Sequence, residues 1–144
     1  MQSTTVLHSI DDTIKLAEII ACQIRAGQIL ALSGPVGAGK TTFVKAFAAA
    51  LGVSETVVSP TYTLLQPYNL PNAINGVEKL IHIDAYRLES AAELRAIGFD
   101  DFVNDSRAVI VIEWAENIGE LLVGRDVQWI DFLFENGRRE VVVR

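Results

Sequence analysis

The residues 34–41, Gly-Pro-Val-Gly-Ala-Gly-Lys-Thr, match the phosphate-binding pattern G-x-x-x-x-G-K-[ST] in full. Glycines at these positions let backbone N–H groups curl around phosphate oxygens, and a helix that begins at the loop adds the positive end of its dipole. Lys40 can reach the β- and γ-phosphates of a nucleoside triphosphate, and the Thr41 hydroxyl can ligate Mg²⁺. The pattern therefore predicts a P-loop that binds a nucleoside triphosphate. The expected nucleotide contacts are Gly34, Val36, Gly37, Ala38, Gly39, Lys40, Thr41 and Thr42.

Two later runs rich in β-branched residues, 80–84 and 108–113, each end on a carboxylate, Asp84 and Glu113. A P-loop needs an acidic residue near the end of a neighbouring strand to hold Mg²⁺ or its water. Open α/β sheets bind their ligands at the carboxyl ends of the strands, where both acids are expected. The alternative is that each is simply the polar residue with which a buried strand reaches the surface. The pattern does not separate Asp84 from Glu113 as the more important acid.

Several weaker signals lie near these runs. The segment Ser59-Pro60-Thr61-Tyr62-Thr63 offers three aliphatic hydroxyls beside a proline that would suit a loop sensing a γ-phosphate, or it is an ordinary turn. His82 precedes Asp84 by two residues on the same strand face, so it either reaches the site or is a core histidine. Arg87 is either a phosphate or partner contact or a surface residue, and Trp114 either packs in the core or flanks the site.

Apolar periodicity, caps and turn residues predict the elements that would position these side chains. Ser9 and Asp12 begin an amphipathic helix that Gly27 closes, and Ser90 with Glu93 has the pattern of a second capped start. The expected helices span 10–24, 40–51, 90–97 and 115–122, and the expected strands 28–33, 80–84, 108–113, 127–134 and 139–143. Residues 65–78 form a hairpin or a loop. We therefore predict an α/β, P-loop NTPase-like fold: a single domain over 1–144 whose mainly parallel sheet is flanked by helices and has an antiparallel hairpin edge.

Length and charge narrow the class of protein. The chain has 144 residues, with 12 basic and 18 acidic side chains and a formal net charge of -6. This balance disfavours a broad, charge-driven grip on nucleic acid or on an anionic membrane. We expect no membrane span and no signal peptide, and hence a cytoplasmic protein. The one cysteine, Cys22, excludes a disulfide framework within the chain and a cysteine-rich zinc site.

Five segments, taken in order, resemble the TsaE family, the bacterial P-loop ATPases needed to make threonylcarbamoyladenosine (t6A) in transfer RNA. The segments are Gly37–Thr42, Ser59–Leu64, His82–Leu88, Glu93–Gly98 and Glu113–Glu116. The resemblance spans roughly residues 34–116, over half of the chain. Many proteins share the P-loop, whereas the ordered set is far more specific.

The resemblance implies an accessory protein that binds ATP or ADP with Mg²⁺, associates with the TsaB and TsaD proteins, and hydrolyses ATP to keep that pair turning over. The implied catalytic residues are Lys40, Asp84 and Glu113, and the implied metal residues are Thr41 and Glu113, the latter through water. Contact with tRNA would be indirect. By resemblance, the nucleotide base lies near residues 10–13. Pro35-Val36 replaces the acidic–aliphatic pair common in the family, and the proline stiffens the loop and removes one N–H.

Two other functions fit the same residues. In a small-molecule kinase, Asp84 and Arg87 would grip the acceptor, and ATP would be consumed in step with a phosphorylated product. In a nucleotide-gated binding module, hydrolysis would be incidental to assembly. The ATPase is favoured because the sequence has no arginine-rich lid after the P-loop to exclude water, as transfer to a small acceptor requires. Such an ATPase is expected to be slow until a partner completes its site.

Overall fold

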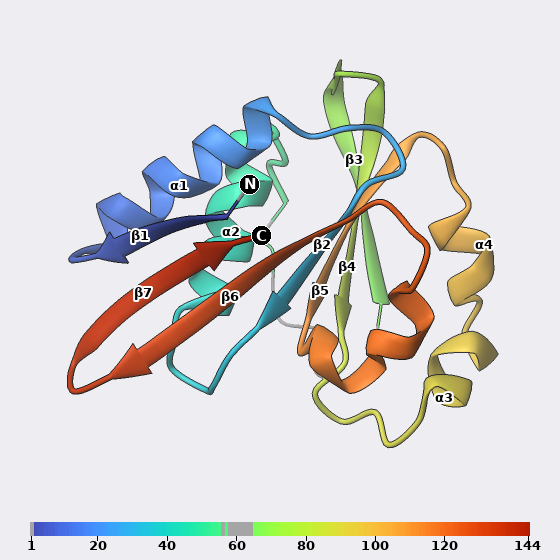
Figure 1. Ribbon diagram of the computed structural model, residues 1–144. Coiled ribbons are helices and arrows are strands. Elements are labelled where there is room, and N and C mark those ends of the chain that lie inside the picture. The colour runs from blue at the N-terminus through green and yellow to red at the C-terminus, as the bar shows by residue number, and fades with distance from the viewer. Residues whose placement is uncertain (1, 56, 58–64) are drawn as a thin grey trace.

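The computed structural model describes residues 2–55, 57 and 65–144. In these residues, seven strands form one mixed sheet in the order β1-β7-β6-β2-β5-β4-β3 (Figure 1). The strands are β1 (Ser3–Leu7), β2 (Ile29–Ser33), β3 (Leu65–Ile74), β4 (Val77–Asp84), β5 (Ala108–Glu113), β6 (Val127–Glu135) and β7 (Arg138–Val143). The four central strands, β6, β2, β5 and β4, run parallel, and antiparallel strands cover both edges. The α/β, P-loop-like fold is confirmed.

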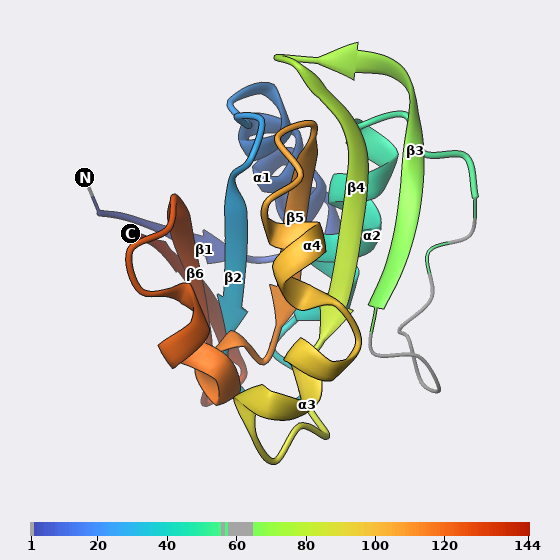
Figure 2. The same cartoon turned by 90° about the vertical axis from the view of Figure 1, so that its right-hand side faces the viewer.

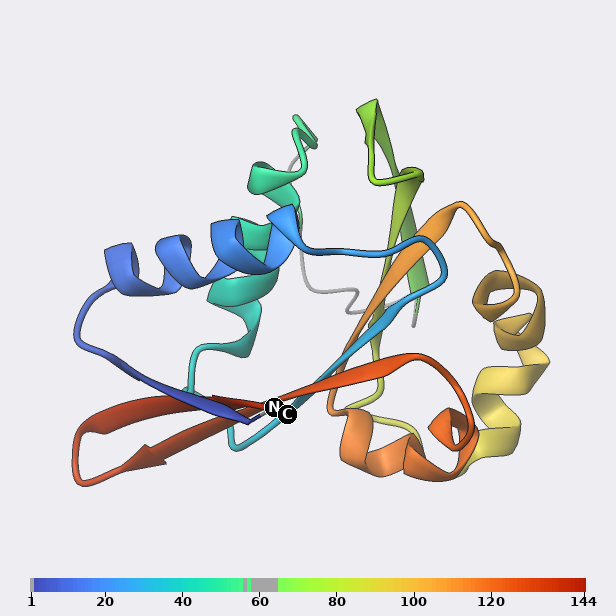
Figure 3. The ribbon, with the colours of Figure 1, turned by 45° about the horizontal axis from the view of Figure 1, so that its top comes forward.

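Helices cover both faces of the sheet (Figures 1, 2 and 3). On one face lie α1 (Ile10–Cys22) and α2 (Lys40–Ala50); on the other lie α3 (Ala91–Ala96), α4 (Phe99–Val103) and the 3₁₀ helix η1 (Ala115–Leu122). Alternate residues of β2 divide between the two cores, Leu30 and Leu32 facing α1 and α2 while Ile29 and Ala31 face η1. Because helices cover both faces of the sheet, all six residues of β5 are buried. A strand that is buried on both faces needs apolar side chains on both, as the sequence of β5 has up to its closing Glu113. No helix of the described residues is long and apolar enough to span a bilayer.

The structure adds elements that the sequence pattern did not predict. Strand β1 pairs antiparallel with β7 and is therefore the outermost strand on the side of the expected hairpin, while β3 forms an antiparallel edge on the opposite side. Residues 65–78, left open between hairpin and loop, form β3, a turn at Asn75-Gly76 and the start of β4. The short helix α4 was also not predicted, and the side chain of Ser90, the N-cap of α3, accepts no cap hydrogen bond. By contrast, the Ser9 side chain does accept from the Asp12 N–H, as its cap pattern predicted.

Candidate functional site

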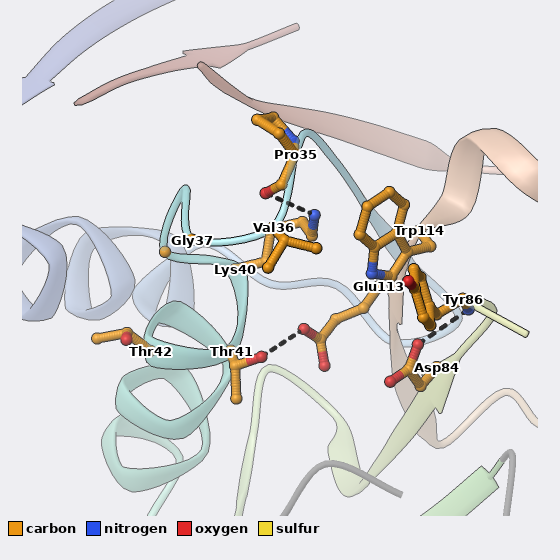
Figure 4. Close-up of a pocket in the computed structure, with 11 residues that line it drawn as sticks. Pro35, Val36, Gly37, Lys40, Thr41, Thr42, Asp84, Tyr86, Glu113 and Trp114 are labelled. Carbon is orange, nitrogen blue, oxygen red and sulfur yellow. Dashed lines mark hydrogen bonds between the residues drawn. The ribbon is translucent and has the colours of Figure 1, made fainter. Parts of the chain in front are cut away.

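The glycine-rich loop lies between the carboxyl end of β2 and the start of α2 (Figure 4). Gly34 crosses β6 so closely that an added Cβ would overlap the Phe132 carbonyl oxygen. Its φ of +129°, together with +82° at Gly37 and +108° at Gly39, is a backbone conformation that L side chains rarely adopt. Gly39 is the N-cap of α2, and it has no side-chain oxygen to accept from the first N–H groups of the helix. The cap residue therefore does not compete with a phosphate for these donors. Backbone conformation thus favours glycine at all three positions, and the close approach to Phe132 requires it at Gly34.

Thr41 and Glu113 meet at the mouth of this loop. The Thr41 hydroxyl, in the first turn of α2, donates to Oε1 of Glu113, the last residue of β5, at 2.9 Å (Figure 4). Since its proton is engaged by the carboxylate, the Thr41 oxygen keeps lone pairs available for a cation. Glu113 is only 2% exposed, and its other oxygen, Oε2, lies 2.7 Å from the His82 ring. The two residues assigned to the metal by resemblance are therefore in direct contact.

Asp84 lies beside Glu113 because β4 and β5 run parallel and in register, with these two residues paired. Its Oδ1 accepts from the Tyr86 N–H at 3.0 Å, an interaction that orients the carboxylate at the strand end. Both acids line one pocket of about 340 Å³. The pocket is lined by Pro35, Val36, Gly37, Gly39, Lys40, Thr41, Thr42, Asp84, Tyr86, Glu113 and Trp114. The carboxylates expected at one edge of the sheet are thus brought together with the loop.

Lys40 is folded back against its own loop. Its ammonium donates to the carbonyl oxygens of Gly34 and, at 3.2 Å, of Pro35, and it lies 3.7 Å from the centroid of the Trp114 ring. Burial lowers the pKa of Lys40, while the carboxylates of Glu116, Glu113 and Asp84 oppose that shift. These contacts hold the Lys40 ammonium in the pocket.

A second hollow of about 380 Å³ opens on the other side of the loop. It shares Gly37, Gly39 and Thr42 with the first pocket and is otherwise lined by Leu7, His8, Ser9, Ile10, Thr13 and Arg139. Residues 10–13, placed near a nucleotide base by resemblance, thus contribute Ile10 and Thr13 to a concavity next to the loop. Arg139 donates from Nε to the Gly37 carbonyl at 3.2 Å across 102 residues of sequence. Sequence reasoning missed Arg139, because no local motif on β7 distinguishes it from a surface arginine.

The remaining predicted residues take other places. Gly34 and Ala38 support the loop: the Gly34 N–H donates to Oε2 of Glu116 at 3.1 Å, and Ala38 is buried beneath it. Glu116 is a further site residue that the sequence analysis left without a role. Arg87 is exposed. The candidate sensing segment Ser59–Thr63 lies outside the described residues.

The oxygen donors at this site suit Mg²⁺. They are the hydroxyl of Thr41 and the carboxylates of Glu113 and Asp84, and Mg²⁺ prefers such hard ligands. Among the described residues, no group of three or more histidine, cysteine or acidic side chains could hold a metal ion without other ligands. Mg²⁺ at nucleotide sites usually takes one or two protein ligands and completes its shell with water and phosphate oxygens. The donor set therefore fits a metal that arrives with a nucleotide.

Comparison with known proteins identifies the family. The family model described as "Threonylcarbamoyl adenosine biosynthesis protein TsaE" matches residues 7–141. The chain is 36% identical over 131 residues to the tRNA threonylcarbamoyladenosine biosynthesis protein TsaE of Bacillus subtilis, covering 91% of this chain and 78% of the relative. With the TsaE protein of Treponema pallidum the identity is 35% over 138 residues, covering 96% and 97%. The chain belongs to the TsaE family.

A solved structure supports the same assignment. The crystal structure of YdiB from Bacillus subtilis superposes with a TM-score of 0.75 at 28% sequence identity, covering 99% of this chain and 84% of that one. The TsaE family match runs from the end of β1 into β7, so it includes both sides of the glycine-rich loop. The resemblance drawn from residues 34–116 is confirmed and extended to nearly the whole chain. The chain is thus a P-loop-type member of a family of t6A biosynthesis proteins.

Proposed function

We propose that this protein binds Mg²⁺-ATP at residues 34–42 and hydrolyses it as an accessory protein of t6A biosynthesis that supports turnover of the TsaB–TsaD complex. The observation that carries the proposal is the 2.9 Å hydrogen bond from Thr41 to Glu113, which joins the start of α2 to the end of β5 at the P-loop pocket. Thr41 and Glu113 come from separate parts of the sequence and are both assigned to Mg²⁺ by resemblance. Because the Thr41 hydroxyl donates to the carboxylate, its oxygen keeps lone pairs for a metal ion.

The side chains of the pocket have separable roles in this proposal. The Lys40 ammonium leaves the carbonyls of Gly34 and Pro35 to neutralise β- and γ-phosphate charge. Thr41 would offer its hydroxyl oxygen to Mg²⁺, and Glu113, which accepts the hydroxyl proton, would help to hold the metal through water. Asp84, oriented by the Tyr86 N–H, supports the metal or the attacking water. When bound, Mg²⁺ offsets the charge that develops on the phosphates.

The nucleotide base is assigned to the second hollow. It is continuous with the loop through Gly37, Gly39 and Thr42, and the side chains of Leu7 and Ile10 give it apolar surface. ADP placed across both pockets would have its phosphates at the N–H groups of the loop and its base against the start of α1. Arg139, held at the Gly37 carbonyl, would border the space between them.

Dependence on partners is supported by the openness of the site. Val36 is 74% exposed and Tyr86 is 54% exposed, although both line the phosphate pocket. Charges and hydrogen-bond donors act on phosphate oxygens more strongly away from bulk solvent, so a partner that covers these residues would complete the site. With a net charge of -6, the chain is suited to reach tRNA through the TsaB and TsaD proteins in the cytoplasm rather than by its own affinity.

Phosphate release from Mg²⁺-ATP by the purified chain, alone and with TsaB and TsaD, tests the proposal. We expect slow release that rises with the partners and disappears in Lys40→Ala. The matched control is Lys45→Ala, which removes an exposed lysine from the same helix and should leave release unchanged. No rise with a folded chain that binds ATP would contradict partner-stimulated hydrolysis, and a phosphorylated metabolite in place of free phosphate would identify a kinase.

A second variant separates hydrolysis from assembly. Glu113→Gln should lower phosphate release and, with it, the output of t6A, while nucleotide binding persists. If t6A output survives the loss of hydrolysis, the chain is a nucleotide-gated binding module and hydrolysis is incidental.

A further inference from the structure

His82 has a position in the core that packing does not account for. It is fully buried on β4, between Leu80 and Asp84 on the face that looks toward α2. Its Nε2 lies 2.7 Å from Oε2 of Glu113, and its Nδ1 has no hydrogen-bond partner among the described residues. An unpaired polar atom in the core costs free energy, which an apolar side chain of similar size would avoid. The imidazole is therefore retained at a cost, and its one hydrogen bond within the described part of the chain joins it to Glu113.

The direction of the hydrogen bond follows from the charge of the carboxylate. An ionised Glu113 can only accept, and we therefore assign the shared proton to His82 Nε2. Glu113 then accepts from His82 at Oε2 and from Thr41 at Oε1. With each oxygen engaged by a different partner, the carboxylate is held in one orientation, and the Thr41 proton is directed at Glu113 while the Thr41 oxygen keeps its lone pairs for a cation.

We propose that His82 is a positioning residue of the magnesium site: it holds the Glu113 carboxylate so that Thr41 presents its lone pairs to the metal. This inference rests on the proposed function, since it assigns a role within the same nucleotide site. His82 lines neither of the two hollows described above and acts only through Glu113. Partners that orient a metal-binding group are commonly worth 10-fold or more in metal affinity.

Calorimetry can separate a role in positioning Glu113 from a purely structural role of His82. It measures the affinity for ADP with Mg²⁺ chelated, and the affinity for Mg²⁺ of the ADP complex. His82→Leu removes the donor at similar volume, and His82→Gln retains an N–H donor on a side chain of similar length. We expect His82→Leu to leave Mg²⁺-free ADP affinity unchanged and to weaken Mg²⁺ binding to the ADP complex by about 10-fold or more. His82→Gln should recover most of that loss.

The control is Leu80→Ala, a buried change on the same face of β4 that lowers stability without removing a hydrogen bond to Glu113. It should leave the Mg²⁺ dependence unchanged. In a Glu113→Gln background, His82→Leu should cause no further loss, because the two residues act as a unit. Equal behaviour of His82→Leu and Leu80→Ala would overturn the inference. If the wild-type chain binds no ADP at all, the proposed function fails instead.

A measurement on the wild-type chain keeps the inference testable even if His82→Leu does not fold. NMR correlation of the imidazole nitrogens with the ring protons identifies the tautomer without any nucleotide. We expect the proton on Nε2, in a hydrogen bond to the carboxylate. A proton on Nδ1 alone would leave nothing to donate to Glu113 and would overturn the inference, whatever the chain binds.

Discussion

Gly34 offers the sharpest test of how the sheet positions the phosphate-binding loop. In Gly34→Ala, the new Cβ would overlap the Phe132 carbonyl oxygen and lie 3.0 Å from the Phe132 carbonyl carbon and Cβ. Backbone atoms of a central strand cannot swing aside as a side-chain end can. The residue would also carry a side chain at φ +129°, a conformation that costs about 1–3 kcal/mol. Overpacking adds about 1–3 kcal/mol.

The expected loss is therefore about 2–6 kcal/mol, a large part of the roughly 5–15 kcal/mol that stabilises an ordinary domain. Gly37→Ala is the matched control, since it places Ala at φ +82° in the same loop with nothing within 4 Å of its Cβ. It should cost only about 1–2 kcal/mol. Urea unfolding followed by circular dichroism measures both free energies of unfolding. Equal losses in the two variants would refute the collision with β6.

Two further predictions concern the metal site and the pH dependence of stability. Thr41→Val should abolish the tightening of ADP binding by Mg²⁺, which Thr41→Ser should retain, and calorimetry that shows no difference between them would contradict the role of the hydroxyl. Two hydrogen bonds lower the pKa of Asp105. The first comes from Lys79, whose Nζ lies 2.9 Å from Oδ2 of Asp105, and the second comes from the Arg107 N–H. Because this pKa is depressed on folding, its contribution to stability is present above about pH 4 and is lost as the pH falls through the folded pKa. Asp105→Asn should therefore lose less stability on acidification than the wild type. Urea unfolding at several pH values measures this loss, and an equal shift of the urea midpoint with pH in the two proteins would contradict the assignment.

Local chemistry explains why much of the site could be predicted. The loop 34–41 is contiguous, so its pattern is visible without knowledge of the fold. Strand β5 must be apolar on both faces because helices cover both, and its closing Glu113 is conspicuous for that reason. The cap at Ser9 likewise depends on neighbours within three residues, and the structure contains it.

Local patterns were insufficient where a contact depends on distant partners. Strand β1 has no strong pattern of its own and is formed by pairing with β7 at the other end of the chain. Ser90 has the cap pattern, yet its side chain makes no cap hydrogen bond. The second hollow requires β1, α1, the loop and Arg139 to converge, and no spacing along the chain encodes that convergence.

The residue types and their spacing along the chain therefore set the chemistry available to this protein: a phosphate-binding loop, two acids at strand ends and the family pattern that joins them. How those groups act on one another depends on the folded arrangement. Parallel register places Asp84 beside Glu113, and folding joins Glu113 to Thr41 on one side and to His82 on the other. The reason is physical: residue types are set locally, whereas hydrogen-bond direction, burial and the shape of a pocket arise where distant segments pack together.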